Sequence, residues 1–162
     1  MDYRIGFSKD IHRLVEKRKL IIGGVVIPFE KGEDAHSDGD VLYHALAESL
    51  LGAMALGDLG TYFPDDSDNT KDMDSALIVK KVAEMVFFKG FEVNNVDILV
   101  SLEKPKLKDY IPQMRENVSA LLRTEIENVS IKAGTNEKMG PVGEGKAIEA
   151  TSIVLLNKIN YC

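Results

Sequence analysis

Residues 35–56 read Ala-His-Ser-Asp-Gly-Asp-Val-Leu-Tyr-His-Ala-Leu-Ala-Glu-Ser-Leu-Leu-Gly-Ala-Met-Ala-Leu, and this stretch carries the clearest fold signal in the chain. Its apolar residues recur at intervals of three and four, which is the spacing of a helix with one buried face. Ser37 or Asp38 is a suitable N-terminal cap, and Gly57 lies just beyond the last apolar residue. We therefore expect a long helix from about residue 38 to Leu56.

The segments on either side of this helix mix strands with helices. Before it we expect a strand at Tyr3–Phe7, a hairpin at Leu20–Pro28 that turns at two glycines, and a charged loop at 29–37. After it we expect a polar loop at 58–73, helices at 74–89 and 108–125, and strands at 91–103, 129–133 and 147–158. The order is not a strict alternation. It predicts an α+β fold in one domain, residues 1–162, with helices on one face of a mostly antiparallel four-stranded sheet and a small N-terminal hairpin.

Composition excludes several classes of protein. The chain has 162 residues, 44% of them apolar, and a net charge of −6, so we expect no general attraction to nucleic acid or to an anionic membrane. Cys162 is the single cysteine, which rules out an intrachain disulfide and a thiolate zinc cluster. We see neither a signal-peptide pattern nor an apolar run of membrane-spanning length, and we expect a cytoplasmic protein.

The three histidines, at positions 12, 36 and 44, lie close together in the sequence. Asp10 and His12 are two residues apart, so in an extended chain their side chains point the same way. His44 falls on the expected helix, on a face shared with Asp40. Two histidines and one aspartate leave one tetrahedral position open, which is typical of a catalytic zinc site. The alternative is a surface His12 and a half-buried helical His44.

Three further polar clusters have both a chemical and an ordinary interpretation. The start of the helix at Ala35–Asp40 could bind a phosphate with its N–H groups, or Ser37 or Asp38 could simply cap it. Asp58 lies between glycines and could accept hydroxyl hydrogens from a sugar, or belong to an acidic surface loop. Thr135 and Glu137 fall on one side of the chain and could face a magnesium-bound phosphate, or form part of a polar turn.

The order of these motifs is more specific than any one of them. It runs Asp-x-His, Gly-Gly-Val-x-Ile-Pro, Ala-His-Ser-Asp-Gly-Asp-Val-x-x-His-Ala-Leu, Leu-Gly-Asp-Leu-Gly-x-x-Phe-Pro-Asp, Ile-Pro-Gln-Met-Arg and Thr-Asn-Glu-Lys-Met-Gly. From about Arg4 to Lys158 the chain resembles the 2-C-methyl-D-erythritol 2,4-cyclodiphosphate synthases of the non-mevalonate isoprenoid pathway.

The resemblance implies a metal-dependent enzyme that converts 4-diphosphocytidyl-2-C-methyl-D-erythritol 2-phosphate to the cyclic diphosphate and CMP. It implies a homotrimer with active sites between subunits. Zinc would be held by Asp10, His12 and His44, and a second divalent ion, Mg²⁺ or Mn²⁺, by Glu137.

The resemblance also implies the residues that contact substrate. His36 and Thr135 would orient and stabilise the phosphates as catalytic residues. The implied substrate-binding set is Asp10, His12, His36, Ser37, Asp58, Gly60, Phe63, Asp65, Pro105, Lys106, Leu107, Ala133, Gly134, Thr135, Asn136 and Glu137.

One loop departs from the family pattern. Residues 140–146 read Gly-Pro-Val-Gly-Glu-Gly-Lys, whereas many relatives have a longer loop with an aromatic residue and an arginine that helps to bind an isoprenoid diphosphate on the trimer axis. Two other functions use the same motifs: a metal-dependent phosphohydrolase that activates water, and a non-catalytic trimeric nucleotide-binding module.

Overall fold

The computed structural model describes residues 2–64 and 73–159 of the chain. A five-stranded sheet runs through the molecule in the order β4-β1-β7-β5-β6. Its strands are β1 (Tyr3–Glu16), β4 (Lys31–Asp34), β5 (Phe91–Ser101), β6 (Val129–Gly134) and β7 (Ala147–Lys158). Only β5 and β6 pair in parallel; the other neighbours are antiparallel. The expected α+β class and mostly antiparallel sheet are therefore confirmed.

The sheet has five strands rather than the expected four, because the segment expected as a charged loop contains β4. β1 is also much longer than expected, and its second half pairs with β4, with Leu14 opposite Glu33. Lys31–Asp34 contains no β-branched or aromatic residue, so local preference does not predict a strand there. Pairing with β1 imposes the extended conformation.

The expected hairpin is present as a separate two-stranded sheet of β2 (Leu20–Ile22) and β3 (Val25–Ile27). Gly23 and Gly24 connect the strands, with φ angles of +57° and +73°. Positive φ at both central residues is typical of a tight hairpin turn, and glycine adopts it without steric cost.

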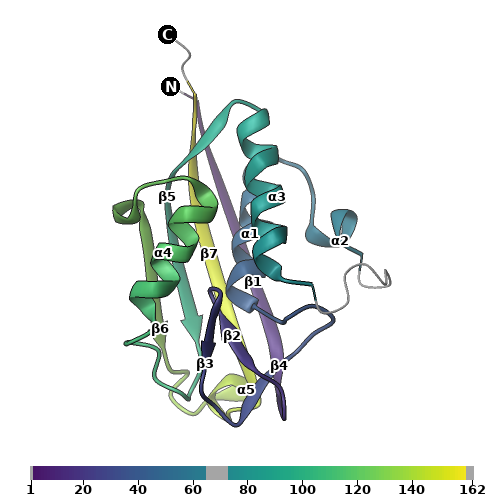
Figure 1. The fold of residues 1–162 in the computed structure, drawn as a ribbon, viewed down its shortest axis with the longest axis vertical. Coiled ribbons are helices and arrows are strands. Elements are labelled where there is room, and N and C mark those ends of the chain that lie inside the picture. Colours follow the sequence, from purple (N-terminus) through teal and green to yellow (C-terminus); the bar gives the residue numbers. More distant parts are fainter. Residues whose placement is uncertain (1, 65–72, 160–162) are drawn as a thin grey trace.

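Three long helices lie on one face of the sheet, in front of it in Figure 1: α1 (Val41–Ala53), α3 (Ser75–Phe88) and α4 (Ile111–Leu122). Short helical segments are α2 (Leu59–Tyr62), α5 (Gly140–Gly143) and a 3-10 turn at Ile126–Asn128. In the described part of the chain, no helix is long and apolar enough to cross a lipid bilayer.

Helix α1 packs very closely on β1, and Gly6 makes this possible. A Cβ atom at Gly6 would lie 1.9 Å from the carbonyl oxygen of Ser49 and 2.9 Å from the Cβ of Ala53. These distances are shorter than any real contact, so only glycine allows the helix to reach this height above the strand. The contact fixes the position of α1 relative to the inward-facing residues of β1.

The opposite face of the sheet carries several exposed apolar side chains. On β1 these are Tyr3, Ile5, Phe7 and Ile11, of which Ile5 is 71% and Phe7 64% exposed. Leu99 on β5 and Ile153 on β7 are also exposed. We call these six residues the open sheet face. Exposed apolar patches of folded proteins are typical of surfaces that bind another protein, a membrane or a ligand.

Candidate functional site

Three potential metal ligands converge where α1 crosses β1. Asp10 and His12 point inward from β1, and His44 projects from α1 toward them. The Nε2 atom of His12 lies 3.0 Å from Oδ2 of Asp10, and Nδ1 of His44 lies 3.4 Å from the same oxygen. The two ring nitrogens are 3.3 Å apart. The predicted cluster is confirmed as a group of residues that can hold a metal ion.

These spacings match a tetrahedral metal site. Ligand atoms placed about 2.0 Å from an ion in tetrahedral geometry are about 3.3 Å from one another. The two imidazole rings are inclined at 75° with centroids 5.1 Å apart, so their ligating nitrogens meet without stacking. Three protein ligands leave the fourth tetrahedral position open.

The outer nitrogen of each histidine has its own partners. Nδ1 of His12 lies 2.8 Å from the carbonyl oxygen of Gly39 and 2.7 Å from Oε2 of Glu33. A carbonyl oxygen can only accept, so this nitrogen carries the proton and Nε2 offers its lone pair to a metal.

His44 is oriented in the same way by hydroxyl groups. Its Nε2 lies 3.0 Å from Oγ of Ser75 and 3.1 Å from Oγ of Ser37. The Ser75 hydroxyl donates to Asp38, so it accepts from His44. Nδ1 of His44 is then the atom available for a metal. Both rings are preset for ligation.

The charges in the cluster reinforce one another. Burial acts to raise the pKa of Asp10, but hydrogen bonds and charge from His12 and His44 outweigh it and hold that pKa well below its usual value. Burial acts to lower the pKa of His12, but Asp10 and Glu33 outweigh it and raise that pKa to about 10. In the metal-free protein a proton therefore occupies the place that a metal would take.

Two fully buried carboxyl groups lie behind the cluster. Burial raises the pKa of Glu33 to about 8, against the hydrogen bond from His12, which acts to lower it. Burial also raises the pKa of Asp40 to about 6, although its carboxyl accepts hydrogen bonds from the N–H groups of Gly23, Gly24 and Tyr43.

Asp40, rather than Ser37 or Asp38, is the N-terminal cap of α1. The helix begins later than expected because Gly39 has a φ of +84°, which is outside the helical range. The carboxyl of Asp40 accepts from Tyr43 N–H, and Glu33 accepts from Val41 N–H. These N–H groups are therefore not available to a phosphate.

A cavity of about 350 Å³ opens over the cluster. Its predicted members are Asp10, His12, His36, Ser37, His44, Gly60 and Phe63. Glu48, Asp34 and Met73 also line it, and no lysine or arginine does so among the described residues. Asp58 caps α2 by accepting from the N–H and hydroxyl of Thr61. Asp65 lies outside the described residues.

A second cavity, also of about 350 Å³, lies at the ends of β5 and β6. Its predicted members are Pro105, Lys106, Leu107, Ala133, Gly134 and Thr135. The Thr135 hydroxyl donates to Oε1 of Glu137 over 2.8 Å, so these two side chains meet beside a turn at residues 137–138. Glu103 fixes the same loop, because its Oε1 accepts from the N–H groups of Asn136 and Lys138.

The two cavities share no lining residue and belong to opposite edges of the sheet. The metal cluster lies on β1, next to the edge strand β4, whereas the second cavity lies at β5 and the other edge strand, β6, with β7 between them. One chain therefore does not bring the predicted metal ligands together with Lys106, Thr135 and Glu137.

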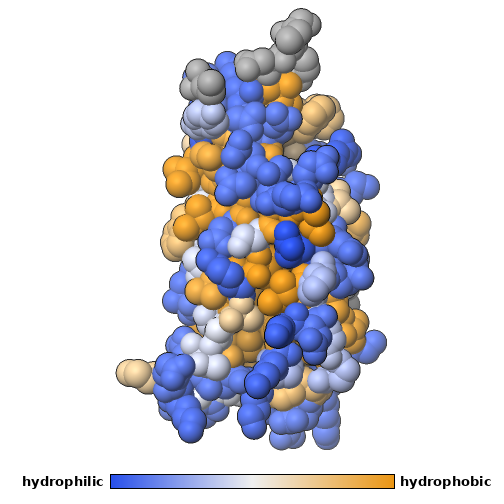
Figure 2. Space-filling model, turned by 90° about the vertical axis from the view of Figure 1, so that its left-hand side faces the viewer, coloured by the Kyte–Doolittle hydropathy of each residue, from blue (hydrophilic) through white to orange (hydrophobic). Residues whose placement is uncertain are grey.

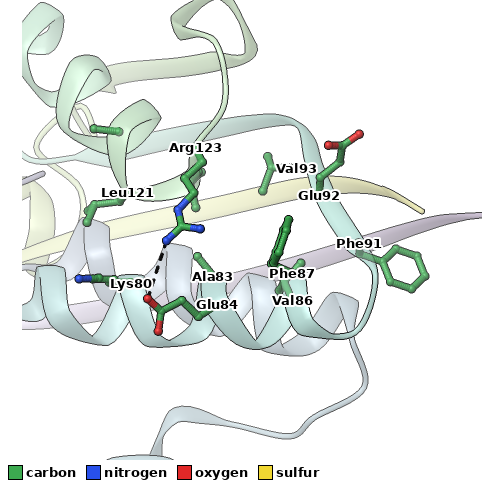
Figure 3. A pocket seen from close by; sticks show the side chains of 12 residues that line it. Lys80, Ala83, Glu84, Val86, Phe87, Phe91, Glu92, Val93, Leu121 and Arg123 are labelled. Carbon is green, nitrogen blue, oxygen red and sulfur yellow. Dashed lines mark ion pairs between the residues drawn. The ribbon is translucent and has the colours of Figure 1, made fainter. Parts of the chain in front are cut away.

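A third hollow lies between α3, α4 and β5 and is lined partly by apolar side chains. Figure 2 shows that apolar side chains also reach the surface on the left-hand side of the view in Figure 1. Figure 3 shows Phe87 and Val93 beside the hollow and the ion pair of Glu84 with Arg123, at 3.9 Å, across it. No predicted site residue lines this hollow, and it contains no histidine.

Sequence reasoning missed three residues around the cluster: Glu33, Ser75 and Glu48. Ser75 had a recognisable signal only as the start of α3, and Glu48 only as a polar position on α1, one turn beyond His44. Glu33 had none, because it stands in a charged stretch of the kind that solvent usually surrounds.

Comparisons with known proteins show which proteins this chain is similar to in sequence and in fold. A 2-C-methyl-D-erythritol 2,4-cyclodiphosphate synthase of Chloroherpeton thalassium is 50% identical over 156 residues, which are 96% of this chain and 99% of that protein. The bifunctional IspDF of Campylobacter jejuni has a structure that matches with a TM-score of 0.94 and 36% identity, over 98% of this chain and 43% of that longer one.

A structure of IspF from Plasmodium falciparum in complex with CDP matches with a TM-score of 0.86 and 35% identity, over 98% of this chain and 97% of that one. The sequence pattern of the YgbB family matches residues 3–157. With a match over nearly its whole length and relatives at this level of identity, the chain is a member of the YgbB family.

Proposed function

We propose that this protein converts 4-diphosphocytidyl-2-C-methyl-D-erythritol 2-phosphate to 2-C-methyl-D-erythritol 2,4-cyclodiphosphate and CMP. The observation that carries the proposal is the convergence of Asp10, His12 and His44, with ligand atoms 3.0–3.4 Å apart, at the base of a cavity. The names of the curated relatives support the same reaction.

Zinc is the ion we assign to the cluster, because two imidazole nitrogens and one carboxylate oxygen with an open fourth position suit it. When bound, zinc would polarise a phosphoryl oxygen and stabilise the negative charge that develops there. Asp10, His12 and His44 hold the site, and the bonds to their outer atoms keep the ligating atoms aimed inward.

The protein residues bind and orient rather than take a proton. The attacking phosphate oxygen is already ionised, so the reaction needs no strong general base. Its difficulty is the approach of anionic groups on a chain whose net charge is −6. We assign His36 and Thr135 to orient the phosphates, Lys106 to offset their charge, and Glu137 to hold a second ion, Mg²⁺ or Mn²⁺.

We further propose that the active site forms between two subunits of a homotrimer. The cluster and the Lys106–Thr135 cavity lie at opposite edges of the sheet, so a neighbouring copy must supply one of them. Three copies in a closed ring place the β4 edge of each beside the β6 edge of the next. The open sheet face supports this arrangement because its apolar side chains would be buried inside the ring.

The test uses purified protein with Zn²⁺ and Mg²⁺ and follows both products, CMP by chromatography and the diphosphate by phosphorus NMR. We expect the cyclic diphosphate and one CMP per turnover. His44→Ala should abolish both, while Lys89→Ala, at an exposed position after α3, should change neither. A linear 2,4-bisphosphate, the product of attack by water, would instead identify a phosphohydrolase, and CDP binding without turnover would identify a non-catalytic module.

A further inference from the structure

Glu33 is a fully buried carboxyl group that touches a predicted metal ligand. It lies on β4, opposite Leu14 of β1, with an exposed fraction of 0%. A carboxyl group in such a place costs free energy unless it is well hydrogen-bonded. For folding stability alone, an apolar side chain would be more favourable at this buried position, as at most neighbouring core positions.

One oxygen of Glu33 makes all its contacts. Oε2 lies 2.7 Å from Nδ1 of His12 and accepts from the N–H of Val41 over 3.0 Å, whereas Oε1 has no hydrogen-bond partner among the described residues. Because the carbonyl of Gly39 places the proton on Nδ1, Oε2 of Glu33 accepts from His12. This holds for either protonation state of Glu33, since a proton would reside on Oε1.

The two histidines of the cluster therefore differ in the groups that contact their outer ring nitrogens. His44 is held by two hydroxyl groups, which are reoriented easily, whereas His12 is held by a carboxyl group on one strand and a carbonyl on the following loop. Gly39 allows this second arrangement, because a Cβ there would lie 2.8 Å from the Cβ of Glu33. The loop and the strand can thus approach the same imidazole nitrogen.

We propose that Glu33 is a positioning residue that fixes the orientation and tautomer of His12 and thereby strengthens metal binding. The proposal rests on the proposed function only in placing zinc on His12. Groups that bond the outer nitrogen of a metal-bound histidine typically contribute about 10- to 100-fold to metal affinity. Glu33 would supply this contribution without touching the metal or the substrate.

The experiment measures the zinc dissociation constant of the full chain by competition with a chromophoric chelator, without substrate. Glu33→Leu keeps the side-chain volume but removes the acceptor, and we expect it to weaken zinc binding by about 10- to 100-fold. Glu33→Gln keeps a carbonyl oxygen within reach of Nδ1 and should restore most of the affinity. Ser49→Ala, which removes another fully buried polar group on α1, is the control for lost stability and should leave zinc affinity unchanged.

A second readout follows the coordination itself. Co²⁺ bound in place of zinc should show altered visible absorption bands in Glu33→Leu and native-like bands in Glu33→Gln. Zinc affinity and cobalt bands that are unchanged in a folded Glu33→Leu protein would overturn the inference, as would a wild-type chain that binds no zinc. If the wild-type chain shows no CMP release but the variants keep the expected order of zinc affinity, the proposed reaction fails and the inference stands.

Discussion

The two edges of the sheet are built in opposite ways. At the β4 edge, Asp10, His12 and His44 are partly buried, and each ring has fixed hydrogen-bond partners on its outer nitrogen. At the β6 edge, residues 135–141 are all exposed, and their contacts are mainly with one another and with Glu103. The first edge is preorganised within one chain, whereas the side chains of the second are largely exposed to solvent.

The largest effect should come from mixing two inactive variants. His44→Ala breaks the β4 edge and Thr135→Ala the β6 edge, and we expect each alone to lower CMP release by about 100-fold or more. If each site joins two chains, mixed trimers from equal amounts of both chains regain about one quarter of wild-type activity. The measurement is CMP release after co-expression. A mixture no more active than its components would show that the site lies within one chain.

A charge on the open sheet face should dissociate the proposed trimer, and so separate the β4 edge of one subunit from the β6 edge of the next. Phe7→Asp would place a carboxylate in an apolar interface, at a cost of several kcal/mol, so association weakens by about 100-fold or more. We expect a monomer by sedimentation that has lost CMP release but still binds zinc.

Phe88→Asp is the matched control for this change, because Phe88 is 85% exposed at the end of α3 and lies off the open sheet face. It should leave both oligomer and activity unchanged. An active Phe7→Asp monomer would contradict the intersubunit site.

Zinc affinity at the β4 edge should depend on pH because of the protonation of His12. Its pKa in the metal-free chain is raised to about 10, so between pH 6 and 8 zinc must displace a proton. Zinc affinity should therefore rise with pH, by about tenfold per unit for one displaced proton. Chelator competition at several pH values measures the slope, and an affinity independent of pH would remove His12 from the ligand set.

The stability of the metal-free chain should change with pH in the opposite direction. His12 and Glu33 both have pKa values raised above those of the unfolded chain, to about 10 and about 8. The folded state then binds more protons, so the stability due to His12 is complete below pH 6.5 and is lost as the pH rises toward 10. Thermal unfolding of the zinc-free protein should show a melting temperature that falls from pH 6.5 to 9.

The smallest effect should come from the β6 edge itself. Lys132 and Asp97 form an ion pair of 2.7 Å, but their side chains are 57% and 42% exposed. Exposed pairs contribute about 0–1 kcal/mol, so Lys132→Ala should lower the free energy of unfolding by less than about 1 kcal/mol. Urea unfolding measures it, and a larger loss would show that this edge is more tightly built than its exposure indicates.

The sequence predicts the elements whose own residues specify them. The apolar spacing of α1, the glycine turn of the hairpin and the expected strand at 147–158 all correspond to structure. The second half of β1 and the whole of β4 were missed, because Lys9–Arg13 and Lys31–Asp34 contain mostly polar residues. Their conformation comes from pairing between distant segments, which local preference does not report.

The site residues also differ in whether the local sequence predicts them. Asp10, His12 and His44 could be predicted because ligand chemistry restricts the residue types, and the structure brings them together. Glu33 could not, since a glutamate in a charged stretch is usually solvated. Its burial follows from the register of β4 on β1, which no local pattern encodes. The assignment of Thr135 and Glu137 to the same active site stays a prediction.

The bare backbone at Gly6 links core packing to coordination chemistry. α1 carries His44, β1 carries Asp10 and His12, and the gap between helix and strand is set where Gly6 meets Ser49. A methyl group at Gly6 would push the helix outward and carry one ligand away from the other two. The distances between the metal ligands thus depend on a residue that contacts none of them. Gly6→Ala would increase the distance between α1 and β1, and so the distance of His44 from Asp10 and His12.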